Sequence, residues 1–177
     1  MRLYMGVDPG LVSGGAAVVD ATGSAVLLAG WYAGAGYIED SKCAERFTLA
    51  PGESAAAAVF WLAFPSAVAI EQPLTVGVGR HADTWRSVGH WEQVARGRKL
   101  PVYLVPFRTW TRAADIAGSD GVAEVRRRVR ELTAHLDPIF PSGTRARGGW
   151  PVQARDAARE AYLIARWCAL ETGGSGV

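Results

Sequence analysis

The chain has 177 residues, of which 49% are apolar and 20% charged, an ordinary composition for a folded domain with its own core. The chain has no run of about 18 apolar residues that would predict a membrane span, and its first residues do not resemble a secretory signal. The two cysteines, Cys43 and Cys168, exclude a disulfide framework and favour a reducing, cytoplasmic setting. We expect a single domain over residues 1–171 and a flexible tail over residues 172–177.

The net charge of +2 conceals an uneven distribution along the chain. Residues 1–79 hold 3 basic and 7 acidic side chains, whereas residues 80–155 hold 14 basic and 7 acidic. Clustered arginines supply much of this excess, which is typical of proteins that bind a polyanion. A solvated charged surface would have the same composition, but nucleic acid is the partner that we favour.

The N-terminal part of the chain predicts a meander of strands followed by a helix. Apolar runs separated by turn residues mark three strands, at residues 3–8, 14–20 and 25–32. Residues 33–50 show no clear periodicity and are expected to be irregular. An Ala-rich stretch over residues 51–64 begins with proline and an early glutamate, which favours a helix.

The rest of the chain alternates buried strands with helices. Short apolar runs at residues 67–70 and 101–105 are typical of strands that are covered on both faces, as in a parallel sheet. Helical periodicity marks three further elements, at residues 81–96, 122–136 and 152–170. Strands joined by helices pair in parallel through right-handed crossovers. The sequence therefore predicts an α/β fold with a five-stranded mixed sheet, three strands antiparallel and two parallel.

Carboxylates stand where two of these strands end. Asp8 closes the first strand and Glu71 closes the strand at residues 67–70, each followed closely by proline, which cannot extend a ladder. A turn-capping role would explain Asp8 alone. A second carboxylate in the same position on a neighbouring strand favours a shared site instead. A helix across that sheet edge would add Asp156 from its first turn.

Three converging carboxylates would repel one another unless cations lie between them. Carboxylate oxygens are the ligands that Mg²⁺ and Mn²⁺ prefer. Two such ions roughly 3.5–4 Å apart are a known arrangement for in-line phosphodiester hydrolysis. The pattern therefore predicts a two-metal nuclease site, with Mg²⁺ as the cofactor and Mn²⁺ as its substitute.

The order of these motifs resembles the RuvC family of Holliday-junction resolvases, and its phage-encoded members in particular. The resemblance runs from residue 3 to about residue 168. It is carried by Gly6-Val7-Asp8-Pro9-Gly10 with Gly14-Gly15, Ala69-Ile70-Glu71-Gln72, Val88-Gly89-His90-Trp91-Glu92, Val105-Pro106-Phe107-Arg108-Thr109-Trp110 and Ala154-Arg155-Asp156-Ala157-Ala158. It implies an RNase H-like fold, a homodimer in the host-cell cytoplasm, and divalent-metal cleavage of branched DNA with Asp8, Glu71 and Asp156 as catalytic metal ligands.

The chain departs from the family pattern in two places. The family commonly has an acidic residue or histidine three positions before its last-helix aspartate, where this chain has Gln153. A neutral carbonyl would hold the second metal more weakly. Glu160, one turn after Asp156, would compensate, although a surface position for Glu160 is slightly favoured. The aromatic residue that cellular members carry after the Glu-Gln pair is replaced by Pro73 and Leu74.

The basic segment supplies the candidates for DNA contact and subunit contact. Arginine and lysine contacts to phosphates position DNA without reading its sequence. The candidate residues are Arg80, Arg86, Arg98, Lys99, Arg108, Arg112, Arg126, Arg127 and Arg130. A four-way junction has approximate two-fold symmetry, which a two-fold dimer matches. Trp85, Val88 and Trp91 on one helix are the candidates for the dimer contact, with ordinary core packing almost as plausible.

Other functions share parts of this pattern. A flap or fork endonuclease and a YqgF-like RNA nuclease would use the same metal chemistry. An actin-like nucleotide-binding protein opens with a similar strand and turn, but it needs a second lobe and a longer chain. A non-catalytic DNA-binding protein would have no use for three carboxylates. We therefore expect a structure-selective endonuclease that resolves Holliday junctions by paired nicks.

Overall fold

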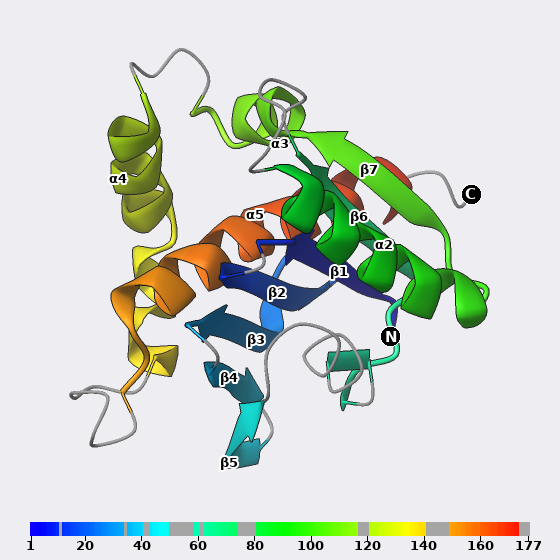
Figure 1. Ribbon diagram of the computed structural model, residues 1–177, viewed down its shortest axis with the longest axis horizontal. Coiled ribbons are helices and arrows are strands. Elements are labelled where there is room, and N and C mark those ends of the chain that lie inside the picture. The colour runs from blue at the N-terminus through cyan, green and yellow to red at the C-terminus, as the bar shows by residue number, and fades with distance from the viewer. Residues whose placement is uncertain are drawn as a thin grey trace.

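A seven-stranded mixed sheet forms the centre of the protein (Figure 1). The computed structural model describes residues 1–10, 12–33, 35–40, 43–49, 59–60, 62–73, 81–116, 121–140 and 149–173. The strand order is β5-β4-β3-β2-β1-β6-β7. The strands are β1 (Leu3–Asp8), β2 (Ser13–Asp20), β3 (Ala25–Tyr32), β4 (Ala35–Asp40), β5 (Cys43–Leu49), β6 (Ala67–Gln72) and β7 (Val102–Pro106).

The sheet has an antiparallel half and a parallel half that meet at β1. The strands from β1 to β5 pair antiparallel in chain order, while β6 pairs parallel with β1 and β7 pairs parallel with β6. This arrangement confirms the expected mixed α/β sheet and its five predicted strands. The central β1 therefore has a parallel neighbour on one side and an antiparallel neighbour on the other.

The expectation that residues 33–50 are irregular was wrong, because they form β4 and β5 at one edge of the sheet. Ile38 of β4 is buried on one face, while Tyr37 packs on the other, which is ordinary strand alternation. Charged residues interrupt the apolar pattern here, and edge strands commonly carry such charges. The helix expected over residues 51–64 lies mostly outside the described residues, which include residues 59, 60 and 62 as helical.

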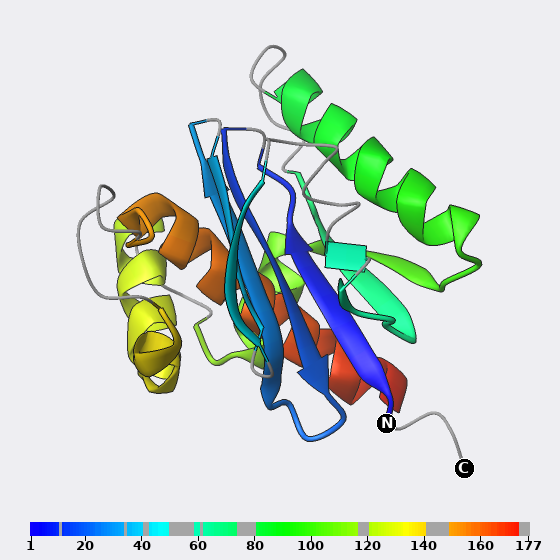
Figure 2. The same ribbon diagram turned by 90° about the horizontal axis from the view of Figure 1, so that it is seen from below.

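Helices cover both faces of the sheet, with α2 and α5 on opposite sides (Figure 2). No helix within the described ranges is long and apolar enough to cross a membrane. The predicted helix over residues 122–136 ends earlier, at Leu132, and continues as a 3-10 helix that contains Pro138. The helices are α2 (His81–Gly97), α3 (Phe107–Ala113), α4 (Val122–Leu132), the 3-10 helix η1 (Ala134–Ile139) and α5 (Val152–Gly173).

The helix α2 packs on the sheet face opposite α5 through side chains that were candidates for the dimer contact. Trp91 is 1% exposed, and its ring stacks on Trp31 of β3 with 5.9 Å between centroids. Val88 is also 1% exposed and belongs to the same core cluster. These two side chains therefore stabilise the fold of one chain and are not free for a subunit contact. Trp85 is 37% exposed on the same helix.

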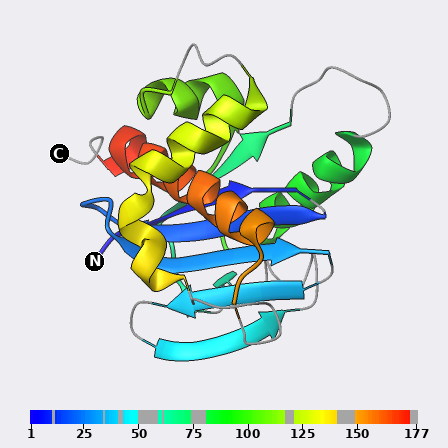
Figure 3. The same cartoon turned by 90° about the vertical axis from the view of Figure 1, so that its left-hand side faces the viewer.

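The long helix α5 crosses β1, β2 and β3 at close range (Figure 3). A Cβ atom added at Gly15 of β2 would lie 2.4 Å from the backbone of Ala157. A Cβ added at Gly6 of β1 or at Gly30 of β3 would lie 2.2 Å from a backbone oxygen of the helix. Real Cβ atoms do not approach backbone this closely, so glycine on three adjacent strands lets α5 lie directly on the sheet.

Substitution at Gly15 tests this close approach. Gly15→Ala must push α5 away from β2, and we expect the free energy of unfolding to fall by about 3 kcal/mol through overpacking. Gly89→Ala on α2 is the matched control, because nothing lies within 4 Å of an added Cβ there. Alanine favours a helix, so this control should gain about 0.5–1 kcal/mol. Urea unfolding of both variants measures the difference; similar values for the two would contradict the packing described.

Candidate active site

Asp8 and Glu71 lie side by side at one end of the sheet. Val7 and Ile70 are register partners in the parallel pair of β1 and β6, so the next residue on each strand is one of these two carboxylates. Side chains alternate along a strand, which places Asp8 on the same face as Gly6 and Glu71 on the same face as Ala69. That is the face covered by α5. The strand register thus places these two acids together at one end of the sheet, as the sequence predicts.

Two tryptophans fix the surroundings of these strand ends. The indole Nε1 of Trp110 on α3 donates a hydrogen bond to Oε2 of Glu71 over 3.1 Å. The indole Nε1 of Trp31 donates to the carbonyl oxygen of Gly10 over 2.7 Å, which holds the turn that follows Asp8. Both rings are nearly fully buried. The carboxylates are therefore held by the core rather than by a surface loop.

The first two turns of α5 bring further polar groups to the same place. Asp156 and Glu160 are one helical turn apart and their side chains are 13% and 17% exposed. They line a small cavity of about 50 Å³ together with Asp8 and Arg126 of α4. The cavity is also lined by Ser13, Gln153 and Ala157. The preference for a surface position of Glu160 was wrong, because close packing of α5 on the sheet buries this side of the helix.

The acids at the site resist ionising together. Burial, and after it the charge of Glu71, raises the pKa of Asp8 to about 8. Burial and the charge of Glu160 raise the pKa of Glu71 to about 8, against a smaller lowering by the Trp110 hydrogen bond. Burial and the charge of Asp8 raise the pKa of Glu160 to about 8. These three carboxyls therefore form one cluster, in which burial and mutual repulsion outweigh the lowering effect of the Arg126 charge on Asp8 and Glu160.

The positive charge nearest to this cluster comes from α4. Arg130 forms a bidentate pair with Asp156, with Nε 2.8 Å from Oδ1 and Nη2 2.5 Å from Oδ2. Arg126 lies farther off, its Nε 4.0 Å from Oε1 of Glu160. The side chains of Arg126 and Arg130 are about half exposed. Of the arginines named from sequence, these two are the ones that the structure brings to the acids.

The other candidate arginines within the described residues lie away from the cavity. Arg127 faces away and pairs with Glu124 and Glu131 of its own helix. Arg86 pairs with Asp83 on α2. Arg98 donates to the carbonyl oxygen of Phe60 on the opposite face of the sheet, next to the exposed Lys99. Arg108 and Arg112 are exposed on α3, and Arg80 lies outside the described residues.

The donor set at this site has the chemistry of a hard-cation site. Carboxylate oxygens dominate it, and a divalent cation would offset both the burial and the mutual repulsion that raise the three pKa values. Among the described residues, no group of three or more acidic, histidine or cysteine side chains is already arranged to hold a metal ion. Both oxygens of Asp156 accept hydrogen bonds from Arg130 instead. The side chains are of the chemical type that binds a divalent cation, but Asp156 is hydrogen-bonded to Arg130.

Sequence reasoning missed Trp110 as a partner of Glu71 and missed the pairing of Arg130 with Asp156. Trp110 was noted only for lying just beyond a strand, at the start of what is now α3. No sequence signal links Arg130 to Asp156, because 26 residues separate them and the contact depends on how α4 packs against α5. A tryptophan that follows the last parallel strand was the one available hint.

Comparison with known proteins gives the class of fold. No protein-family model and no curated protein sequence matches the chain. The solved structure of Thermus thermophilus RuvC covers 97% of this chain and 98% of its own, with 17% identity and a TM-score of 0.51. T. thermophilus RuvC in complex with Holliday junction substrate covers 98% of this chain and 97% of its own, with 16% identity and a TM-score of 0.59. The chain therefore has an RNase H-like fold of the RuvC type.

The raised pKa values predict how stability depends on pH without divalent cations. The folded state keeps protons on the clustered carboxyls up to about pH 8, whereas unfolded carboxyls release theirs near pH 4. The free energy of unfolding should therefore fall as pH rises from about 4 to about 8. Glu71→Gln keeps an oxygen to accept from Trp110 and removes one titrating charge, so we expect it to reduce that fall by about 1–3 kcal/mol.

Urea unfolding at pH 5 and pH 8 in a chelating buffer measures this effect. Glu131→Gln is the control, since this glutamate is exposed on α4 and lies outside the cavity. Wild type and this control should lose similar stability between the two pH values. An identical loss in Glu71→Gln would show that Glu71 is ionised normally in the folded protein.

Proposed function

We propose that the chain is a divalent-metal-dependent, structure-selective DNA endonuclease that resolves Holliday junctions by paired nicks. The observation that carries this proposal is the meeting of Asp8, Glu160 and Asp156 at one small cavity, with Glu71 close enough for its charge to act on Asp8. Three elements distant in sequence supply these acids. Packing alone does not explain why charged groups from all three are buried together, whereas a shared functional site does. The likeness in fold to RuvC, one structure of which holds a Holliday junction substrate, supports the choice of substrate.

The roles of the residues follow from their positions. Asp8 and Glu71 would hold one Mg²⁺ between the strand ends, while Asp156 and Glu160 would hold a second from α5, with the Gln153 carbonyl as a weaker ligand. Divalent cations held there would supply the charge that activates a water and stabilises a leaving oxygen. Trp110 holds the Glu71 carboxylate in place through its hydrogen bond. Arg126 lies beside the acids and is placed to bind the phosphate on the scissile strand.

The proposal extends to the assembly and the source of the protein. A symmetric junction is cut in two places, so a homodimer with two identical sites matches it. Trp85 remains an exposed candidate for the dimer contact after Val88 and Trp91 are assigned to the core. Arg86, Arg108 and Arg112 remain exposed candidates for backbone contacts away from the acids. The phage-type motifs favour a phage-encoded resolvase over a cellular one.

The main alternative is an endonuclease with the same site and another substrate. A flap or fork endonuclease, or a YqgF-like RNA nuclease, would need the same carboxylates and the same cations. The difference would lie in the dimer and in the groove that receives the nucleic acid. Substrate preference is therefore the property that separates these functions.

Substitution of Asp8 tests the catalytic claim. Asp8→Asn removes a charge that holds metal without changing the shape of the side chain, so we expect cleavage to fall at least about 1,000-fold while junction binding in a chelator is retained. Asp20→Asn is the matched control, because Asp20 closes a turn at the end of β2 with bonds to the backbone N–H groups of Thr22 and Ser24. The control should cleave as wild type does. Equal loss of binding and cleavage in Asp8→Asn would count against a role in metal binding.

Substrates of defined shape test the resolvase claim. Wild type should cut an immobile four-way junction with Mg²⁺ or Mn²⁺ at symmetric positions and leave plain duplex intact. Equal cleavage of a flap or fork would support the metal mechanism but would show that the protein is a flap or fork endonuclease and not a resolvase. Cleavage of RNA alone would favour the RNA nuclease.

A further inference from the structure

Arg130 of α4 pairs with Asp156 of α5 at the wall of the cavity. Arg130 uses Nε and Nη2 to engage both carboxylate oxygens, which is the planar two-bond geometry that guanidinium groups favour. The Asp156 side chain is 13% exposed, whereas that of Arg130 is 49% exposed. The carboxylate is thus enclosed while the arginine reaches it from the solvent side.

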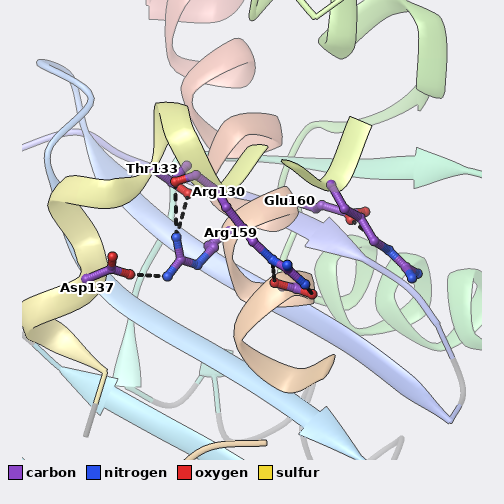
Figure 4. Close-up of polar contacts among 7 residues, drawn as sticks. Arg130, Thr133, Asp137, Arg159 and Glu160 are labelled. Carbon is purple, nitrogen blue, oxygen red and sulfur yellow. Dashed lines mark hydrogen bonds and ion pairs between the residues drawn. The ribbon is translucent and has the colours of Figure 1, made fainter. Parts of the chain in front are cut away.

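The backbone at Arg130 is held by a second arginine, Arg159 of α5. Arg159 of α5 is 6% exposed and donates from Nη1 to the carbonyl oxygen of Arg130 over 3.3 Å and to Thr133 Oγ1 over 3.2 Å. Its Nη2 pairs with Asp137 of η1. Figure 4 shows Arg159 between Thr133 and Asp137, with Arg130 extending past it. The end of α4 is therefore fixed on α5, and the Arg130 side chain is the part that is free to change partner.

The pairing of Arg130 conflicts with a metal-binding role for Asp156. An aspartate whose two oxygens both accept from a guanidinium has one acceptor position on each oxygen filled, and a divalent cation bound there competes with that arginine for the carboxylate. Arginine binds phosphate with the same two-bond geometry that it uses for carboxylate. A DNA phosphate near the cavity would therefore offer Arg130 an equivalent partner.

We propose that Arg130 exchanges between Asp156 and a phosphate of the DNA backbone, so that DNA binding frees Asp156 to bind the divalent cation. This inference rests on the proposed nuclease function. Without DNA, Arg130 occupies Asp156 and the site holds metal weakly. With DNA, the phosphate takes the guanidinium and the acidic site is complete.

The exchange has a thermodynamic consequence. Two ligands that each favour the same rearrangement must raise the affinity for one another by the same factor. Removing the Arg130 guanidinium should reproduce the effect of DNA on the metal site, with an expected gain of about ten-fold in metal affinity. It should also remove one phosphate contact, which lowers the slope of log K against log salt by about one.

Mn²⁺ binding to the full chain without DNA is the first test. Titration followed by the electron paramagnetic resonance of free Mn²⁺ would compare wild type, Arg130→Gln and Arg128→Gln. Arg128 is exposed on the same helix and does not line the cavity, so its variant measures the general effect of removing one positive charge. We expect about ten-fold tighter Mn²⁺ binding in Arg130→Gln and less than about two-fold in Arg128→Gln.

A double-mutant cycle ties the gain to Asp156. The gain from Arg130→Gln should disappear when Asp156→Asn is also present, because the freed ligand is then missing. Persistence of the gain in the Asp156→Asn background would assign it to general electrostatics and overturn the exchange. Junction binding in a chelator, measured by fluorescence anisotropy at several salt concentrations, supplies the phosphate half of the test. An unchanged salt slope in Arg130→Gln would also overturn the exchange.

The outcomes separate the exchange from the function on which it rests. If wild type and Arg130→Gln bind no Mn²⁺ with or without a junction, the metal-dependent function fails and the exchange fails with it. If both bind Mn²⁺ equally and wild type cleaves junctions, the function stands and the exchange alone is overturned.

Discussion

The position of α5 against the sheet is the constraint on which the rest of the structure depends. Glycine on β1, β2 and β3 leaves no side chain between these strands and the helix, and α5 has alanine at its contact positions. Backbone therefore packs on backbone across three strands. This close approach brings the first turns of α5 down to the strand ends, where Glu160 lies within the electrostatic reach of Asp8 and Glu71. Without it, the two acids on the sheet would have no counterpart on the helix.

The site that results has too much negative charge for its degree of burial. Three carboxyls with raised pKa values lie together, and the nearest cations are two arginines of one amphipathic helix. This imbalance favours binding of a divalent cation, and the two arginines beside it offer positive charge to a phosphate. A phosphodiester-cleaving site requires both kinds of group. The buried Arg159 completes the arrangement from underneath, because it fixes the end of α4 on α5. The charges at the cavity are thus set by packing contacts well outside it.

Much of this arrangement could be predicted from sequence because it depends on local pattern. An apolar run followed by an acid and a nearby proline marks the strands that end in Asp8 and Glu71. Parallel pairing of these strands then places the two carboxylates together. The edge strands β4 and β5 were missed, since charged residues interrupt their alternation where an edge tolerates them. The burial of Glu160 and the pairing of Arg130 with Asp156 were not predictable, because the first depends on how closely α5 packs on the sheet and the second on how α4 packs against α5.

The central claim is that this acidic cavity binds divalent cations, and crystals grown with saturating Mn²⁺ and a junction test it most directly. The account predicts anomalous scattering peaks at the cavity, each about 2.0–2.3 Å from carboxylate oxygens, with Asp8 and Glu71 sharing one ion and Asp156 turned from Arg130 toward another. Absence of any peak beside Asp8 and Glu71, with the junction bound, would contradict the account.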